Sequence, residues 1–132
     1  MSSLTAIVTC LALLFYALLS VRVAVARAKY NISAPATTGH PVFERAFRIQ
    51  QNTGEQLLIM LPALWLFSIF VAPLWACLLG LVWIGGRILY AVGYIREPER
   101  RLAGFGISFG ASGLLLLGAL IGAAWQYLHA GM

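Results

Sequence analysis

Hydrophobic residues run in four long segments along this chain, and polar residues gather between them. The segments cover roughly residues 4–28, 43–71, 74–95 and 102–128. Each is at least as long as the roughly 20 residues that an α-helix needs to cross the core of a bilayer. The connections are too short for a separate soluble domain. The pattern therefore predicts a single domain over residues 1–132, an all-α integral membrane bundle of four transmembrane helices.

Composition supports the same fold class. Hydrophobic residues make up 61% and charged residues 10% of the 132 positions, and the mean hydropathy is +0.88. Soluble domains have about a quarter of their residues charged. We interpret the first segment as a retained span and not as a signal peptide. Residues 1–10 hold no Lys or Arg, and the apolar run is longer than the roughly 7–15 residues of a signal peptide's apolar region.

The basic residues are distributed unevenly and predict the topology. All of them flank the first and third connections, whereas the second connection and both ends of the chain have none. The nine are Arg22, Arg27, Lys29, Arg45, Arg48, Arg87, Arg96, Arg100 and Arg101. The positive-inside rule places the two basic connections in the cytoplasm and both termini outside. The net charge of +5 is therefore explained by membrane topology, and we expect no nucleic-acid partner.

The second segment joins a polar half-helix to an apolar one. Residues 43–56 carry most of its polar side chains, and residues 57–71 are almost entirely apolar. At 3.6 residues per turn, one stripe of the polar half holds Glu44, Arg48, Asn52 and Glu55. Charged side chains at membrane depth are costly and usually face a protein interior or a wet cavity. The stripe predicts a polar site within one leaflet of the membrane.

Two features of the helices predict close packing and assembly. Gln50 lies two positions from both Arg48 and Asn52, so it points away from the stripe. In a lone subunit it would face lipid, which favours an oligomer in which a neighbour covers it. The fourth segment contains glycines four residues apart, at 106 and 110 and at 118 and 122. This spacing allows helix backbones to approach closely, and without a preceding strand it does not indicate a nucleotide site.

The third segment adds a second polar face, because Arg87, Tyr90 and Tyr94 share one side of a helix. Tyr94 alone is also explained as an aromatic residue at the membrane interface. Cations together with amide, phenol and carboxylate groups suit a small anionic ligand that also carries an ammonium group. Glu55 would bind the ammonium, and arginines would bind carboxylates. The alternative is an internal salt bridge of Glu55 with Arg48 or Arg87 that serves assembly only.

The cysteines and histidines predict no metal site and no redox pair. Cys10 and Cys77 lie in separate apolar runs, and no His lies at ligand spacing from either.

Three motifs resemble the MAPEG family, the membrane-associated proteins in eicosanoid and glutathione metabolism. The resemblance is to its branch of microsomal glutathione transferases and leukotriene C synthases and covers about residues 21–102. The motifs are Thr37-Thr-Gly-His-Pro, Phe43-Glu-Arg-x-Phe-Arg-x-Gln-x-Asn-x-x-Glu and Arg87-x-x-Tyr-x-x-Gly-Tyr94, followed by Arg101-Leu. The family implies a homotrimer that binds glutathione, its co-substrate, between adjacent subunits in the cytoplasmic leaflet.

The resemblance also assigns residues to the glutathione site. One subunit would contribute Arg48, Asn52, Glu55, Tyr90, Tyr94 and Arg101, and the neighbouring subunit Arg27 and Gln50. Arg87, on the face of Tyr90, is included among the binding residues. Arg101 matches the arginine that stabilises the glutathione thiolate in this branch and is the predicted catalytic residue.

Three positions depart from the family's specialised members. Gln56 replaces a frequent Tyr, and Ala28 replaces a second arginine proposed to assist epoxide opening in leukotriene C synthase. Leu102 stands where the prostaglandin E synthase branch has Ser. The resemblance therefore implies a broader glutathione transferase or peroxidase that acts on hydrophobic electrophiles or lipid hydroperoxides. A non-catalytic lipid- or glutathione-binding member and a small proton-coupled multidrug transporter are the alternatives.

Overall fold

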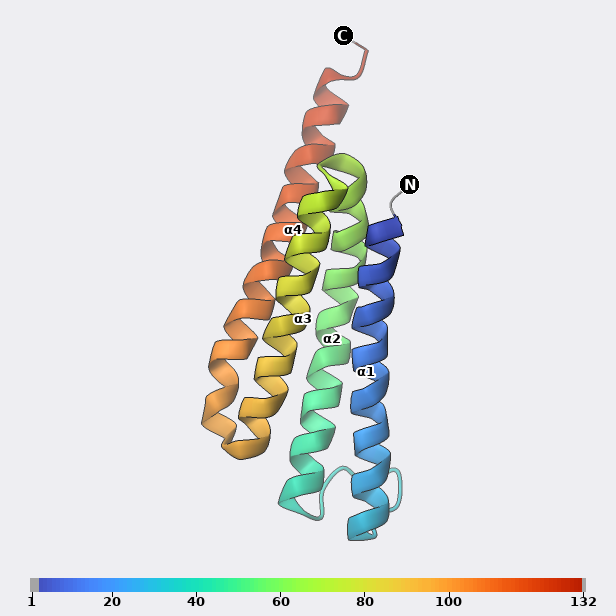
Figure 1. Ribbon diagram of the computed structural model, residues 1–132, viewed down its shortest axis with the longest axis vertical. Helices are drawn as coiled ribbons and strands as arrows, with labels where there is room; N and C mark the ends of the chain where they lie inside the picture. Colours follow the sequence, from blue (N-terminus) through green and yellow to red (C-terminus); the bar gives the residue numbers. More distant parts are fainter. Residues whose placement is uncertain (1–2, 132) are drawn as a thin grey trace.

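The computed structural model of this protein describes residues 3–131, which form four long helices and one short 3-10 turn (Figure 1). The elements are α1 (Ser3–Tyr30), α2 (Pro41–Phe70), α3 (Pro73–Arg96), η1 (Pro98–Arg100) and α4 (Arg101–His129). All four long helices have the length and hydropathy needed to cross a membrane. The predicted all-α class and the four predicted segments are confirmed, and η1 is an addition that the hydropathy pattern did not contain.

Local sequence explains where α2 and α3 begin. The side chain of His40 caps α2, because its Nδ1 accepts a hydrogen bond from the backbone N–H of Val42 at 3.1 Å. The His40 ring also stacks on Tyr30 with ring centroids 3.7 Å apart, which ties the start of α2 to the end of α1. Pro41 and Pro73 occupy the first positions of their helices. There the missing N–H costs nothing and the fixed φ favours the helix.

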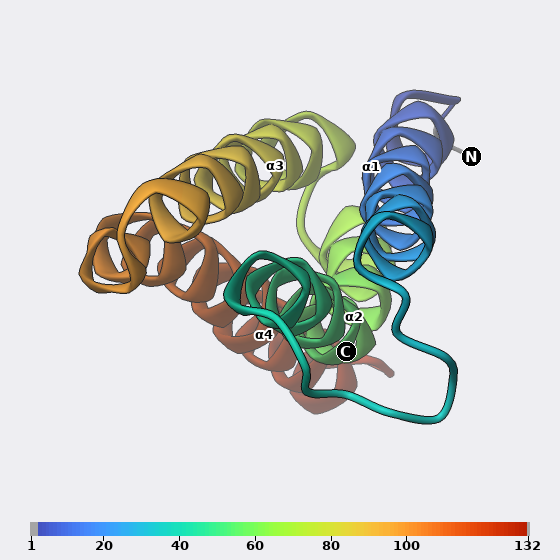
Figure 2. The ribbon, with the colours of Figure 1, turned by 90° about the horizontal axis from the view of Figure 1, so that it is seen from below.

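The helices run up and down, so the start of α1 and the end of α4 lie at one end of the bundle (Figure 1). The loop between α1 and α2 and the η1 turn lie at the other end. Helix α2 packs against α1, α3 and α4, and the view along the bundle shows α1 and α3 on different sides of it (Figure 2). The polar first half of α2 is therefore at the same end as η1 and the start of α4.

The apolar half of the bundle supplies its core. Met60, Leu64, Trp83 and Leu115 have no exposed surface. Large apolar side chains also cover the outside of all four helices, among them Leu14 and Leu58, with exposed fractions of 60% and 78%. Such a continuous apolar exterior is expected for a surface in contact with lipid.

Glycines allow close approach of helices, partly at the predicted positions and partly at others. A Cβ on Gly104 of α4 would lie less than 3.0 Å from backbone atoms of Tyr90 and Gly86 on α3. Gly118 and Gly122 pack against the end of α2, as their spacing predicted. Gly106 and Gly110 have no atom within 4 Å of an added Cβ, so their predicted packing role is wrong within the chain. The spacing of the glycines indicated close packing, but it did not show which face of α4 meets another helix.

Candidate functional site

A polar cavity of about 240 Å³ lies between α2, α3 and the start of α4, in the half of the bundle nearest η1. We call it the inner cavity. Its lining consists of Arg48, Asn52, Glu55, Tyr90, Tyr94 and Arg101. These six are the residues that the sequence assigned to a single subunit's part of the site. Helical spacing brings them together, because Arg48, Asn52 and Glu55 share one face of α2 and the two tyrosines share one face of α3.

The lining of the inner cavity places hydrogen-bond donors around one carboxylate. Arg48 and Arg101 are cationic and Glu55 is anionic, so the lining has a net charge of +1. Both Arg48 and Glu55 are exposed, whereas Tyr90 is 4% exposed and forms the cavity's buried wall. The Tyr90 ring meets the Tyr94 ring edge-on, with centroids 5.7 Å apart. This arrangement is suited to a ligand with several anionic or carbonyl oxygens and one cationic group.

Arg101 is held at the rim of the inner cavity by the η1 turn. Its Nη1 donates a hydrogen bond to the backbone carbonyl of Pro98. Its guanidinium carbon lies 5.5 Å from the centroid of the Tyr94 ring. The neighbouring Arg100 points elsewhere, because its Nε donates to the Glu97 carboxylate at 3.1 Å and it lines a separate surface groove. The two adjacent arginines thus lie in different surroundings, as the offset of one residue predicted.

Arg87 lies behind the inner cavity and not in its lining. Its side chain is fully buried, and its guanidinium donates hydrogen bonds to Asn52, Thr53 and Ser108. Residues of the bundle surround the Arg87 guanidinium, so a ligand in the inner cavity has no direct access to it. This position does not agree with the prediction that Arg87 contacts glutathione directly.

The alternative interpretation of Glu55 as half of an internal salt bridge is wrong for this chain. Within residues 3–131 the ion pair is Arg100–Glu97, at the surface. Among these residues neither Arg48 nor Arg87 pairs with Glu55, and the hydrogen bonds of Arg87 go to neutral oxygens. The Glu55 carboxylate is therefore available at the cavity.

Arg27 and Gln50, predicted to reach a neighbour's site, lie away from the inner cavity of their own chain. Arg27 donates to the Ala36 carbonyl at 2.8 Å and stacks over the Phe43 ring. Gln50 donates to Tyr16 Oη at 3.1 Å. The prediction that a lone subunit leaves Gln50 facing lipid is wrong, because α1 packs on this side of α2 and supplies hydroxyl acceptors.

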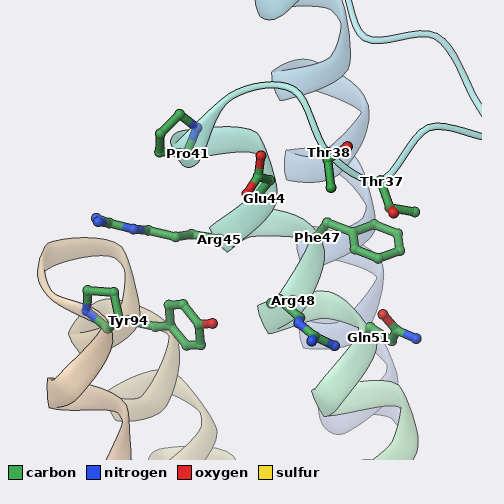
Figure 3. Close-up of a pocket in the computed structure, with 10 residues that line it drawn as sticks. Thr37, Thr38, Pro41, Glu44, Arg45, Phe47, Arg48, Gln51 and Tyr94 are labelled. Atoms are coloured by element: carbon green, nitrogen blue, oxygen red, sulfur yellow. The ribbon is translucent and has the colours of Figure 1, made fainter.

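A second, larger cavity of about 560 Å³ lies beside the inner cavity, toward the loop between α1 and α2 (Figure 3). We call it the outer chamber. It shares Arg48 and Tyr94 with the inner cavity, and Figure 3 shows the Tyr94 hydroxyl pointing toward the α2 side. Its further lining is Thr37, Thr38, Pro41, Glu44, Arg45, Phe47, Gln51 and Pro98. The outer chamber and the inner cavity therefore adjoin at Arg48 and Tyr94.

Arg45 spans the edge of the outer chamber. Its Nη1 donates to the backbone carbonyl of Ile95 at 3.0 Å, and Figure 3 shows its side chain extending from α2 toward the end of α3. Sequence reasoning gave Arg45 no role in the site. Its position three residues before Arg48, on a neighbouring part of the same helix face, was the available signal.

No group of three or more His, Cys, Asp or Glu side chains able to hold a metal ion occurs among residues 3–131. The polar residues of the site are instead arginines, tyrosines and amides, which suit an organic anion better than a cation.

Comparisons with known proteins match nearly the whole chain. The chain is 49% identical over 121 residues to an uncharacterized protein of Synechocystis, covering 92% of this chain and 88% of that protein. It is 41% identical over 109 residues to microsomal glutathione S-transferase 2 of Homo sapiens, covering 83% and 74%. It is 39% identical over 128 residues to leukotriene C4 synthase of Bos taurus, covering 97% and 85%.

The family assignment agrees with the four-helix membrane fold. A model of the MAPEG family matches residues 5–121, which include every residue of both cavities. The chain therefore belongs to the MAPEG family.

Proposed function

We propose that this protein is a membrane-bound glutathione transferase or peroxidase. The observation that carries the proposal is the inner cavity, in which six residues from three helices present cations, phenols and an amide around one carboxylate. Glutathione has two carboxylates, two amide carbonyls and one ammonium group, which match these donors and Glu55. Relatives with glutathione S-transferase and leukotriene C4 synthase activities in their names support the same chemistry.

In the proposed reaction Arg101 stabilises the glutathione thiolate. A thiol is a weak nucleophile until it loses its proton, and a nearby guanidinium favours the ionised form. In conjugation the thiolate sulfur forms a bond to an electrophilic carbon while the leaving group departs. In peroxide reduction the thiolate sulfur bonds to the terminal peroxide oxygen as the O–O bond breaks, which leaves glutathione sulfenic acid, and the departing alkoxide takes up a proton to become the alcohol. The thiol of a second glutathione then attacks the sulfenic acid sulfur, which gives the disulfide and water. Hydrophobic electrophiles or lipid hydroperoxides would enter from the membrane, and glutathione through the outer chamber.

The deciding experiment is a glutathione-dependent conjugation assay on the purified protein, run in parallel with a lipid hydroperoxide. We expect turnover with at least one class of substrate and none without glutathione. Glutathione binding without turnover would indicate a non-catalytic binding member. Glutathione-independent, proton-driven efflux in vesicles would instead support a transporter.

We also propose a homotrimer whose sites are shared between subunits. Arg27 and Gln50 are absent from the lining of their own chain's inner cavity, and the family resemblance assigns both to the site of an adjacent subunit. Arg27→Ala and Arg101→Ala should each lower activity alone. In mixed trimers, a site that takes Arg101 from one variant and Arg27 from the other is intact, so co-expression should restore activity. Mass measurement in mild detergent checks the trimer, and a mixture no more active than its components would refute shared sites.

Glu55 should contribute to glutathione affinity through the ligand's ammonium group. Loss of one charged hydrogen bond costs about 1.5–3 kcal/mol, so Glu55→Gln should weaken binding by roughly 10- to 150-fold. Isothermal titration with glutathione measures the effect. Glu99→Gln is the control, because Glu99 lines the separate surface groove near Arg100. Equal affinity of the Glu55 variant and the control would exclude this role.

The site is proposed to face the cytoplasm, with both termini outside. Basic residues flank the two connections at the η1 end of the bundle, which is the basis of the orientation. Single cysteines introduced at Thr38 and Ala130 should label from the cytoplasmic and the opposite side, respectively. The reverse labelling pattern would overturn the orientation.

A further inference from the structure

Arg87 is a charged side chain enclosed by the helices of the bundle. It lies on α3 and has an exposed fraction of 0%. Its guanidinium donates to Asn52 Oδ1 at 2.7 Å, to Thr53 Oγ1 at 2.9 Å and to Ser108 Oγ at 3.3 Å. The acceptors belong to α2 and α4, so a single guanidinium connects three helices.

Among the residues that the structure describes, Arg87 has neutral partners and no carboxylate. The ion pair within residues 3–131 joins Arg100 and Glu97 at the surface. A buried charge within the membrane carries a large desolvation cost, and well-packed apolar residues often replace such groups without loss of stability. Packing alone therefore gives no reason for an arginine at this position. Its contact with Asn52 gives one, because Asn52 lines the inner cavity.

Arg87 fixes the orientation of the Asn52 amide. A guanidinium has only donors, so it can bind the amide oxygen of Asn52 but not the amide nitrogen. Rotating the amide by half a turn would place its NH₂ group against the guanidinium and lose the 2.7 Å hydrogen bond. The Oδ1 atom is therefore held toward Arg87, and the Nδ2 group is left to donate to a ligand in the inner cavity.

Arg87 also supports the adjacent wall of the inner cavity. Its guanidinium carbon lies 4.0 Å from the centroid of the Tyr90 ring, a cation–π contact that holds the ring in place. Two neighbouring residues of the lining, Asn52 and Tyr90, thus rest on the same buried cation.

We infer that Arg87 is a positioning residue, which makes Asn52 an obligatory hydrogen-bond donor and so selects a carbonyl or carboxylate oxygen of glutathione at that point. The inference rests on the proposed function, because it names the group that the inner cavity recognises there. Arg87 acts on ligand selection through Asn52 and does not touch the ligand. A ligand with a donor in place of that oxygen meets the Asn52 NH₂ group and is rejected.

A double-mutant cycle tests this coupling. Equilibrium binding of glutathione to the purified full-length protein is measured for wild type, Arg87→Met, Asn52→Ala and the double variant. Each single change should weaken binding about fivefold, the value of one net hydrogen bond. If Arg87 acts through Asn52, the double variant should stay within about twofold of the weaker single variant. Independent effects would multiply to about 25-fold and would overturn the inference.

Asn52→Asp provides a second test that leaves Arg87 in place, so it does not depend on whether Arg87→Met folds. The new carboxylate accepts from Arg87 and has no proton to donate at neutral pH. Glutathione binding should fall by about tenfold or more, further than for Asn52→Ala, because a donor is replaced by a charged acceptor. Binding equal to wild type would show that the Asn52 amide does not donate to glutathione, and the inference would be wrong.

Two further readouts separate this role from a general structural one. With Asn52→Ala and Asn52→Asp, the KM for glutathione should rise while kcat stays close to the wild-type value. Glutathione analogues with one carboxylate converted to a carboxamide keep an oxygen acceptor and should still bind to wild type at the Asn52 position. If wild type binds no glutathione at all, the proposed function fails. If it binds but the cycle is multiplicative, only the role of Arg87 fails.

Discussion

Replacement of Arg101 by alanine should reduce turnover at neutral pH by about ten- to thirtyfold while glutathione still binds. A free thiol is only a few per cent ionised at pH 7, so a cation that completes the ionisation raises the reactive fraction by at most about thirtyfold. The guanidinium lies at the rim of the inner cavity, fixed by its hydrogen bond to the Pro98 carbonyl and its contact with the Tyr94 ring. Glutathione affinity should change less, because Arg48, Asn52 and Glu55 remain.

The effect of Arg101→Ala should shrink as the pH rises. In the proposed mechanism the arginine lowers the pKa of the bound glutathione thiol, so the thiol should ionise at higher pH in the variant than in the wild type. Added base then performs the deprotonation that the guanidinium no longer assists, and the two rates should converge toward pH 9. A pH–kcat profile with saturating glutathione measures this, and ultraviolet absorbance of the bound thiolate gives an independent reading.

Arg100→Ala is the matched control for Arg101→Ala. It removes the same charge one position away, but Arg100 pairs with Glu97 and faces a separate groove. Exposed ion pairs contribute about 0–1 kcal/mol, so neither activity nor stability should change much. Greater loss of activity for Arg100→Ala than for Arg101→Ala would show that the catalytic arginine has been misassigned.

Helical periodicity grouped five of the six residues that line the inner cavity, and the family resemblance added Arg101. Arg48, Asn52 and Glu55 lie on one face of α2, and Tyr90 and Tyr94 on one face of α3. Any bundle that turns both faces inward at the same depth brings them together. The hydropathy pattern also placed all four helices to within a few residues, because long apolar runs have few alternatives in a membrane.

Periodicity could not show what lies opposite a given side chain. Gln50 was predicted to face lipid because helical periodicity gives only the direction in which a side chain leaves its helix. The structure places Tyr16 of α1 in that direction. Arg87 was assigned to the ligand site for the same reason. Its burial depends on the approach of α4 to α3, which brings Ser108 within hydrogen-bond distance. That approach depends in turn on Gly86 and Gly104, whose pairing is visible only in three dimensions.

Gly104→Ala should damage stability and activity together. The added methyl group would lie less than 3.0 Å from the backbone nitrogen and Cα of Tyr90 and from the carbonyl oxygen of Gly86. Backbone atoms of a packed helix cannot rotate away as a flexible side chain can, so α3 and α4 must separate. Overpacking of this kind costs about 1–3 kcal/mol. We expect the free energy of unfolding to decrease by an amount near the upper end of that range. Thermal or denaturant unfolding in detergent measures the decrease.

The same separation should disturb the site from two sides, since Gly104 lies on α4 between Arg101 and Ser108. Moving α4 outward shifts Arg101 relative to the inner cavity and lengthens the contact of Ser108 with Arg87.

Gly106→Ala is the control, and its expected change in stability has the opposite sign. Its Cβ meets no atom within 4 Å, and alanine favours a helix interior over glycine by about 1 kcal/mol. Gly106→Ala should therefore match or exceed wild-type stability, whereas a Gly104→Ala variant of wild-type stability and activity would contradict the close approach of α3 and α4.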